Sequence, residues 1–163
     1  MDLKTENTIA ALNEYGERIK DQMVENLFNN RSVDTGTLAN AITYEVDDKN
    51  LTARIFVQDK GWYGITVEDG IGRKAGRMPP IIPIQNWIRK KNLRPKAGAT
   101  VEQFAWAIAK NIAKKGTNPK PKPFAAPAVK QVKENFGDEI IEIGAGEDIE
   151  AATTMMFKES TII

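Results

Sequence analysis

The sequence predicts an α+β fold, in which a small antiparallel sheet built around one hairpin has helices packed on one side. Residues 42–57 read as the hairpin, because apolar side chains alternate with polar ones on both sides of the turn letters DDKN. Residues 5–30 read as a long N-terminal helix, because their apolar side chains recur at spacings of three and four.

Two short segments flank the predicted hairpin. Before it, NNRSVDTG interrupts the first helix, and Thr35 is placed to cap a short helix through Leu38 to Ala41. After it, WYGITVEDG (residues 62–70) is apolar, but its periodicity does not distinguish a helix from a strand.

Three further helices are predicted in the second half of the chain. The first covers residues 83–92, with a proline in its first turn. The second begins at Thr100, which forms a capping box with Gln103, and it ends at Gly116. The third covers residues 126–136 and follows the proline-rich segment TNPKPKPFAAP.

The length and composition fit one globular domain. A chain of 163 residues with 41% hydrophobic and 28% charged residues suffices for one core. We expect a single domain over residues 1–136 and an acidic extension over 137–163, whose order before assembly the sequence leaves open. MDLKTENTIA lacks the basic flank and apolar run of a secretory signal, and no eighteen-residue apolar run is present, so we expect no membrane contact.

The residue types disfavour catalysis. The chain contains no cysteine and no histidine. Disulfides, thiolate nucleophiles, imidazole bases and nearly all transition-metal sites are therefore excluded. We expect no enzyme activity, no cofactor and no metal.

Charge is distributed in three blocks. Residues 1–72 hold 7 basic and 13 acidic residues, residues 73–133 hold 15 and one, and residues 134–163 hold one and 8. The central block therefore has a net charge of +14, between blocks of −6 and −7. Such blocks indicate either a polyanionic partner or neighbouring copies that pair acidic and basic faces.

The glycine-rich loop VEDGIGRKAGRMPP (residues 67–80) does not match a phosphate-binding motif. Gly70 and Gly76 are six positions apart, and Arg77 and Met78 follow where the motif requires lysine and then a hydroxyl residue. The dinucleotide pattern beginning at Gly70 has Ala75 in place of its third glycine, and prolines follow where a helix is required. We interpret the loop as a flexible, basic contact segment.

The paired carboxylates have structural explanations. Asp47 and Asp48 are accounted for by the hairpin turn. Glu68 lies in an otherwise apolar segment and needs a partner, for which Arg73 and Arg77 are the candidates in a structural salt link.

The basic block contains two tryptophans. Trp87 shares an apolar helix face with Ile88 and is expected in the core, whereas Trp106 is expected to be partly exposed at an interface. Lysines cluster at the polar end of the predicted helix that contains Trp106. Such a stripe suits non-specific phosphate contact, and it also suits a solvated helix face.

Three segments resemble, in order, segments of the phage tail-completion or minor tail proteins, the head–tail neck family of lambdoid-type long-tailed phages. VDTGTLANAIT (33–43) resembles their TG-x-L-x-x-S-I segment, and WYGITVEDGIGRKAGRMPP (62–80) is similar to Y-A-x-x-V-E-x-G-T. KPKPFAAPAVKQ (120–131) is similar to P-x-R-P-F-L-x-P-A, while residues 137–163 have no counterpart. The residues that carry the likeness are Thr35, Gly36, Leu38, Glu68, Gly70, Pro123 and Phe124.

The resemblance implies a non-enzymatic virion protein that forms a homo-oligomeric ring at the head–tail joint, through which genomic DNA passes. Its partners would be other neck, connector and tail-tube proteins, with non-specific contact to DNA, and it would reside in the host cytoplasm during assembly. The candidate contact residues are Arg73, Lys74, Arg77, Arg89, Lys90, Lys91, Lys120 and Lys122.

Two alternatives remain at this point. A small nucleic-acid-binding protein would bind DNA as a monomer, with an affinity that falls steeply as salt rises. Its contact residues would be Arg89, Lys90, Lys91, Lys110 and Lys114. An enzyme acting through Glu68 and a nearby acid is disfavoured by the missing residue types.

Overall fold

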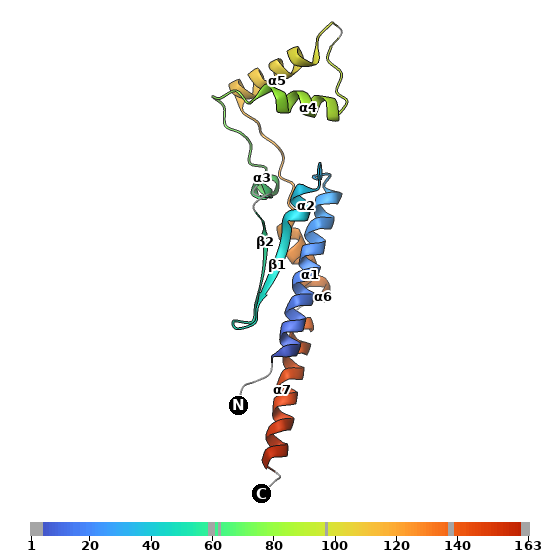
Figure 1. Ribbon diagram of the computed structural model, residues 1–163, viewed down its shortest axis with the longest axis vertical. Coiled ribbons are helices and arrows are strands. Elements are labelled where there is room, and N and C mark those ends of the chain that lie inside the picture. The colour runs from blue at the N-terminus through green and yellow to red at the C-terminus, as the bar shows by residue number, and fades with distance from the viewer. Residues whose placement is uncertain (1–4, 59–60, 62, 97, 137–138, 161–163) are drawn as a thin grey trace. The chain divides into compact units, whose positions relative to one another are not determined.

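The computed structural model describes residues 5–58, 61, 63–96, 98–136 and 139–160, with residues 153–160 described by their backbone alone. The chain divides into two compact units: unit 1 comprises residues 1–68 and 122–163, and unit 2 comprises residues 69–121 (Figure 1). The predicted α+β class, with a long N-terminal helix and helices on one side of the sheet, is confirmed.

Helix α1 (Glu6–Asn29) is the central element of unit 1 and confirms the predicted helix. It contacts both strands of the hairpin as well as helices α6 and α7. Its buried apolar side chains follow the predicted helical spacing. They are Ala11, Ile19, Met23 and Leu27.

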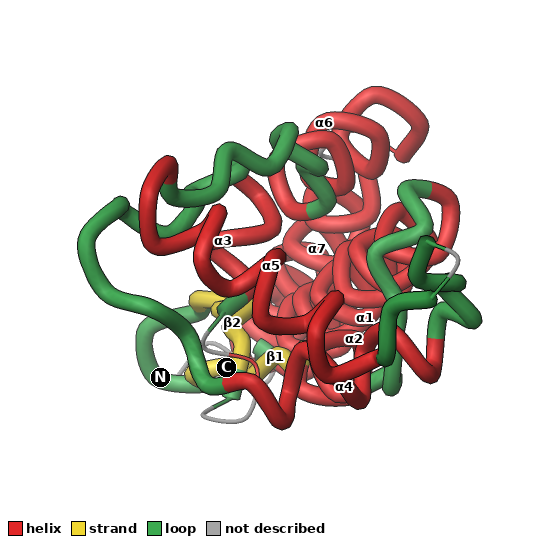
Figure 2. Tube along the Cα trace, turned by 90° about the horizontal axis from the view of Figure 1, so that it is seen from above, coloured by secondary structure: helices red, strands yellow, loops and turns green. Residues whose placement is uncertain are grey.

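The predicted hairpin is confirmed as strands β1 (Ile42–Asp47) and β2 (Thr52–Val57), shown in yellow in Figure 2. The strands pair antiparallel, so that Tyr44 lies opposite Ile55. Helix α1 approaches the hairpin closely, since a Cβ added at Gly16 would lie 2.7 Å from the Tyr44 ring. The apolar face of the hairpin therefore packs on α1.

The two predicted segments that flank the hairpin each form a short helix. Helix α2 (Thr37–Ala41) has Gly36 as its N-cap, with φ of 76°, and no side-chain capping bond. Gly36 takes the N-cap position expected for Thr35, because the chain enters the helix through a left-handed residue, a conformation that glycine adopts readily, while the Thr37 amide donates a long hydrogen bond of 3.5 Å to the Thr35 hydroxyl. Helix α3 (Gly64–Asp69) resolves the ambiguous apolar segment as helical.

Helices α6 (Ala125–Phe136) and α7 (Glu139–Ser160) complete unit 1 along α1. The predicted helix over 126–136 is confirmed as α6. Helix α7 occupies most of the expected extension, of which residues 137–138 and 161–163 lie outside the described part of the chain. The domain boundary at residue 136 stays a prediction.

Unit 2 contains helices α4 (Ile81–Lys90) and α5 (Val101–Lys115), which pack on each other. The capping box is confirmed: the Gln103 amide donates to the Thr100 hydroxyl at 3.1 Å, and the Thr100 amide donates to the Gln103 side chain at 2.9 Å. The centre of the contact is closely packed, because Ile88 of α4 and the small Ala105 and Ala109 of α5 are fully buried.

Candidate functional site

Parts of the three segments that resemble the neck family meet in unit 1, at a place we call the junction. It comprises Leu38 in α2, Glu68 in α3, and Pro123 and Phe124 before α6. Leu38 and Phe124 are both buried in the main apolar cluster, at 3% and 2% exposure. Three stretches separated in sequence thus form one packed feature.

Glu68 caps the N-terminus of α6 from outside that helix. Its carboxylate accepts hydrogen bonds from the backbone amides of Phe124, Ala125 and Ala126, at 2.7, 3.0 and 3.1 Å. The first amides of a helix have no partner within it, and the N-terminal dipole favours a negative charge there. This geometry corrects the expectation of an arginine partner: Glu68 has a structural role, but through backbone amides.

Protonation of Glu68 is disfavoured by the same contacts. Partial burial raises the pKa of the Glu68 carboxyl, but the hydrogen bonds from the amides of Ala125, Phe124 and Ala126 outweigh it. The pKa therefore lies below its usual value, and the residue holds α6 as a carboxylate at neutral pH.

The end of α1 holds the other side of the junction. The side-chain amide of Asn26 donates to the Phe124 carbonyl at 3.1 Å, and that of Asn30 donates to the Pro123 carbonyl at 2.8 Å. The ammonium of Lys122 donates to the Asn30 carbonyl at 2.8 Å. Lys122, a candidate contact residue, thus satisfies a carbonyl at the C-terminal end of α1, where a cation is favourable.

A second carboxylate, missed by the sequence reasoning, caps α1. Asp148 of α7 is 3% exposed and accepts hydrogen bonds from the Asn7 and Thr8 amides at 3.1 and 2.8 Å, and from the Thr8 hydroxyl at 2.6 Å. Gly144 lies one turn earlier on the same face and packs against Asn7 and Ala11. The sequence signal available for this contact was the four-residue spacing of Gly144 and Asp148, which places both residues on one helix face.

Substitution of Asp148 by asparagine is expected to loosen α7 from the first turn of α1. The hydrogen bond from the Thr8 hydroxyl does most to lower the pKa of the Asp148 carboxyl. The carboxylate therefore stabilises this contact above the usual aspartate pKa of about 3.9, and the contribution is lost as pH falls through the lower folded value. Hydrogen exchange should show faster exchange of the Asn7 and Thr8 amides in the variant at neutral pH.

Glu147 supplies the control for that experiment, because it is the neighbouring acid on α7 and is exposed. Glu147→Gln removes the same charge and should leave exchange in the first turn of α1 unchanged. Equal protection in the Asp148→Asn variant and the wild type would contradict the capping role.

In unit 2 the glycine-rich loop lies against the segment that leads out of α5. Arg73 and Thr117 exchange two hydrogen bonds, from the Arg73 amide to the Thr117 hydroxyl at 2.7 Å and from the Thr117 amide to the Arg73 carbonyl at 2.8 Å. A Cβ at Gly72 would collide with the Thr117 carbonyl, and Gly70 has φ of 65°. The glycines therefore allow two chain segments to approach, and the loop backbone is anchored at Arg73.

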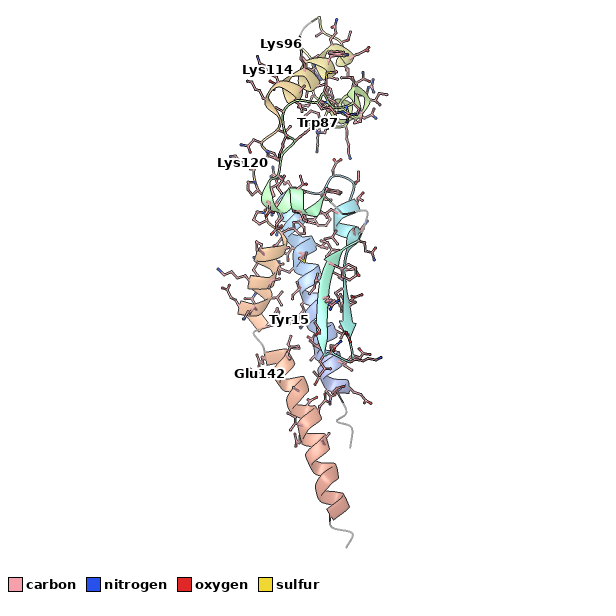
Figure 3. The ribbon with its side chains drawn as sticks, turned by 90° about the vertical axis from the view of Figure 1, so that its left-hand side faces the viewer. Tyr15, Trp87, Lys96, Lys114, Lys120 and Glu142 are labelled. Atoms are coloured by element: carbon pink, nitrogen blue, oxygen red, sulfur yellow. The ribbon has the colours of Figure 1, made fainter. Side chains whose placement is uncertain are left out.

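The cationic side chains of unit 2 lie on its surface. Lys96, Lys114 and Lys120 project into solvent (Figure 3). The remaining predicted contact residues of this unit are also exposed. They are Arg73, Lys74, Arg77, Arg89, Lys90 and Lys91. Lys110 of the alternative set is exposed as well.

The two tryptophans of the basic block are both half-exposed. Trp106 is 49% exposed, in line with its expected position. Trp87 is 46% exposed, so its expected place in the core is wrong. The reason is that α5 covers only the Ile88 side of α4 with small alanines, and Trp87 lies at the edge of that contact.

The two units carry opposite net charges, as the sequence blocks do. Unit 2 holds 12 Lys/Arg against Asp69 and Glu102, a net charge of +10. Unit 1 holds the other 11 basic and 20 acidic residues, a net charge of −9. In net charge, unit 1 is therefore complementary to unit 2, and unit 2 is also complementary to a polyanion.

Comparison with protein-family models, with curated proteins and with solved structures found no match to this chain. Within the described ranges, no group of three or more acidic side chains is placed to hold a metal ion. No helix in the same part of the chain combines the length and the apolar character needed to cross a membrane.

Proposed function

We propose that this chain is a structural protein of a long-tailed phage that forms a homo-oligomeric ring at the head–tail joint, through which genomic DNA passes. The observation that carries the proposal is the junction. The three segments that resemble the neck family supply its parts: Leu38, then Glu68, then Pro123 and Phe124. Residues with a shared structural role are expected to recur together in a family, whereas chance likenesses have no reason to meet.

Charge separation supports a ring that encloses DNA. A unit with a net charge of +10 offers the phosphate contacts that a passing duplex makes without sequence preference. A unit with a net charge of −9 in the same chain lets neighbouring copies associate through unlike surfaces. The other partners in this role are connector, neck and tail-tube proteins, and the role requires no cofactor, metal or catalytic residue.

The mass of the nuclease-treated protein in solution tests the ring. Light scattering at low and moderate salt, with and without a short DNA duplex, should give a defined multimer whose mass does not depend on DNA. Electron microscopy of that species should then show a closed ring. A protein that stays monomeric, even when it is mixed with connector and tail-tube proteins, would exclude the proposed ring.

The loop cations are expected to act in assembly or DNA passage. A phage whose protein carries alanine at Arg73, Lys74 and Arg77 should yield fewer infectious particles than the wild type, because three exposed cations of unit 2 are lost. The control is alanine at Lys49, Arg54 and Lys133, three exposed cations of unit 1. Normal infectivity of the loop variant would count against the role of these residues.

One observation favours a second candidate, a nucleic-acid-binding protein that acts alone. The exposed residues Arg89, Lys90, Lys91, Lys110 and Lys114 all belong to the unit with the +10 charge. This candidate requires a monomer that binds the duplex and releases it as salt rises. The light-scattering measurement with DNA therefore separates the two candidates.

A further inference from the structure

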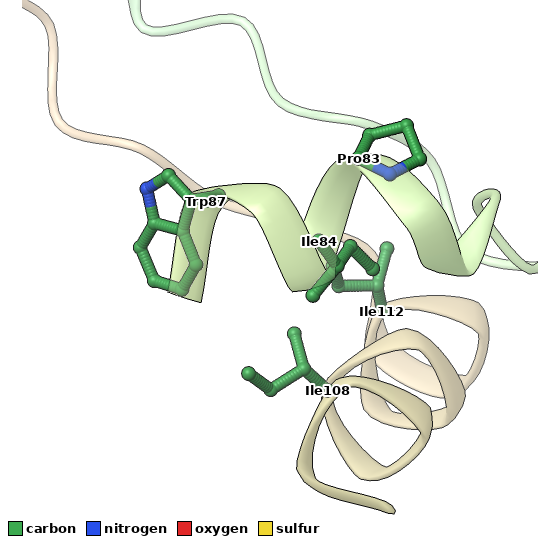
Figure 4. Close-up of a pocket in the computed structure, with 5 residues that line it drawn as sticks. All are labelled: Pro83, Ile84, Trp87, Ile108 and Ile112. Atoms are coloured by element: carbon green, nitrogen blue, oxygen red, sulfur yellow. The ribbon is translucent and has the colours of Figure 1, made fainter. Parts of the chain in front are cut away.

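Unit 2 has an apolar pocket of about 280 Å³ between α4 and α5 (Figure 4). Its lining consists of Pro83, Ile84, Trp87, Ile108 and Ile112. Small-molecule sites usually exceed about 300 Å³ and contain a few polar groups that orient the ligand. A small pocket lined only by apolar side chains instead fits a side chain of a protein partner.

Cations continue the helix faces that form the pocket. Lys91 follows Trp87 by four positions, and Lys115 follows Ile112 by three, so each lies beside a lining residue on the helix surface. Both lysines are exposed. An apolar centre with a cationic edge suits a partner surface in which an apolar side chain is flanked by acids.

The outer face of α7 has this pattern. Ile143 is 54% exposed, and exposed acids surround it on the helix. They are Glu139, Glu142, Glu147 and Glu150. Gly146 lies on the same face, and none of the described residues comes within 4 Å of the position that its Cβ would take. Glycine in a helix interior costs about 1 kcal/mol relative to alanine, and at this exposed position it leaves room for the close approach of another chain.

We propose that unit 2 binds the outer face of α7 from a second copy of this chain, with Ile143 of that copy in the pocket beside Trp87. The glutamates around Ile143 then face the lysines at the pocket edge. The two surfaces differ, so the contact is head-to-tail, the kind of contact that forms a ring when its rotation closes. This inference rests on the proposed ring and names the contact that forms it.

Sedimentation velocity over a range of protein concentrations measures the contact. Ile143→Lys and Trp87→Ala should each weaken self-association by about tenfold or more, because each removes the apolar centre of the interface. Raising the salt from about 0.1 M to about 1 M should also weaken self-association of the wild type, because the Debye length falls from about 10 Å to about 3 Å.

Matched controls separate the contact from general effects. Ile65→Lys places the same charge on another isoleucine of unit 1 that is 67% exposed, and Trp106→Ala removes a tryptophan of unit 2 that is 49% exposed outside the pocket. Both controls should associate like the wild type. Far-ultraviolet circular dichroism should show all four variants folded.

Mixing the two defective variants gives the sharpest test. Each variant retains one of the two surfaces, so the Ile143→Lys protein still offers its pocket and the Trp87→Ala protein still offers its α7. The mixture should form a dimer at protein concentrations at which neither variant alone associates. Failure of the mixture to dimerise would overturn the head-to-tail assignment.

Two further outcomes would also overturn the inference and leave different conclusions about the ring. A wild-type multimer that both variants still form would reject this contact while the ring proposal stands. A wild-type protein that stays monomeric and binds anionic lipid vesicles through Trp87 would assign the pocket to a lipid surface. The ring proposal would then depend on the mixture with connector and tail-tube proteins.

Discussion

Substitution of Phe124 by alanine is expected to lower the free energy of unfolding of unit 1 by about 3–5 kcal/mol. The ring is 2% exposed and belongs to the apolar cluster that joins α1, α2 and α6. Removing it leaves a cavity at the junction, since its neighbours Leu38 and Leu27 are held on separate helices and cannot all move inward. Among the side chains that the structure describes, Phe124 is the largest that is fully buried.

Hydrogen exchange followed by mass spectrometry should measure this loss, because it reports on each unit separately. Peptides from α1 and α6 should lose protection in the Phe124→Ala protein, whereas peptides from α5 should exchange as in the wild type. Phe56→Ala is the control, because Phe56 is 40% exposed on the hairpin. Equal effects of the two substitutions would show that Phe124 does not anchor the junction.

Substitution of Glu68 by glutamine is expected to destabilise unit 1 by about 1–3 kcal/mol at neutral pH. The two carboxylate oxygens of Glu68 accept from three amides at the start of α6. Glutamine offers those amides one acceptor oxygen and no charge. The upper end of this range requires full burial, and Glu68 is only partly buried, so solvent reduces the effect.

The pH dependence identifies the carboxylate as the cause. Because the folded pKa of Glu68 lies below the usual glutamate value of about 4.3, the ionised form stabilises the fold above that value. This contribution disappears as pH falls through the folded pKa. Denaturant unfolding should therefore show a gap between wild type and Glu68→Gln that is full at pH 7 and shrinks in acid.

Asp69→Asn is the matched control, because it removes the charge of the adjacent, exposed residue. The free energy of unfolding of the Asp69→Asn protein should match that of the wild type both at pH 7 and in acid. A Glu68→Gln protein as stable as the wild type at pH 7 would show that α6 does not need this cap.

Local signals explain why the elements of the fold were predictable. The long N-terminal helix, the hairpin and the capping box of Thr100 and Gln103 depend on residues a few positions apart, or on strands joined by one turn. Thr35 shows the limit of this reasoning. A hydroxyl residue before a short helix suggests a cap, but the neighbouring glycine can adopt a left-handed conformation that threonine avoids.

The sequence alone therefore determined the fold class, most of the elements and the uneven charge, whereas the tertiary structure decided the partners of the polar residues that join distant parts of unit 1. Glu68 bonds an amide 56 positions away, Asp148 one 140 positions away, and Lys122 a carbonyl 92 positions away. Every residue except proline has a backbone amide, so no residue type marks the one that a distant carboxylate will meet. Only the packing of α3 and α7 against the starts of α6 and α1 selects those partners.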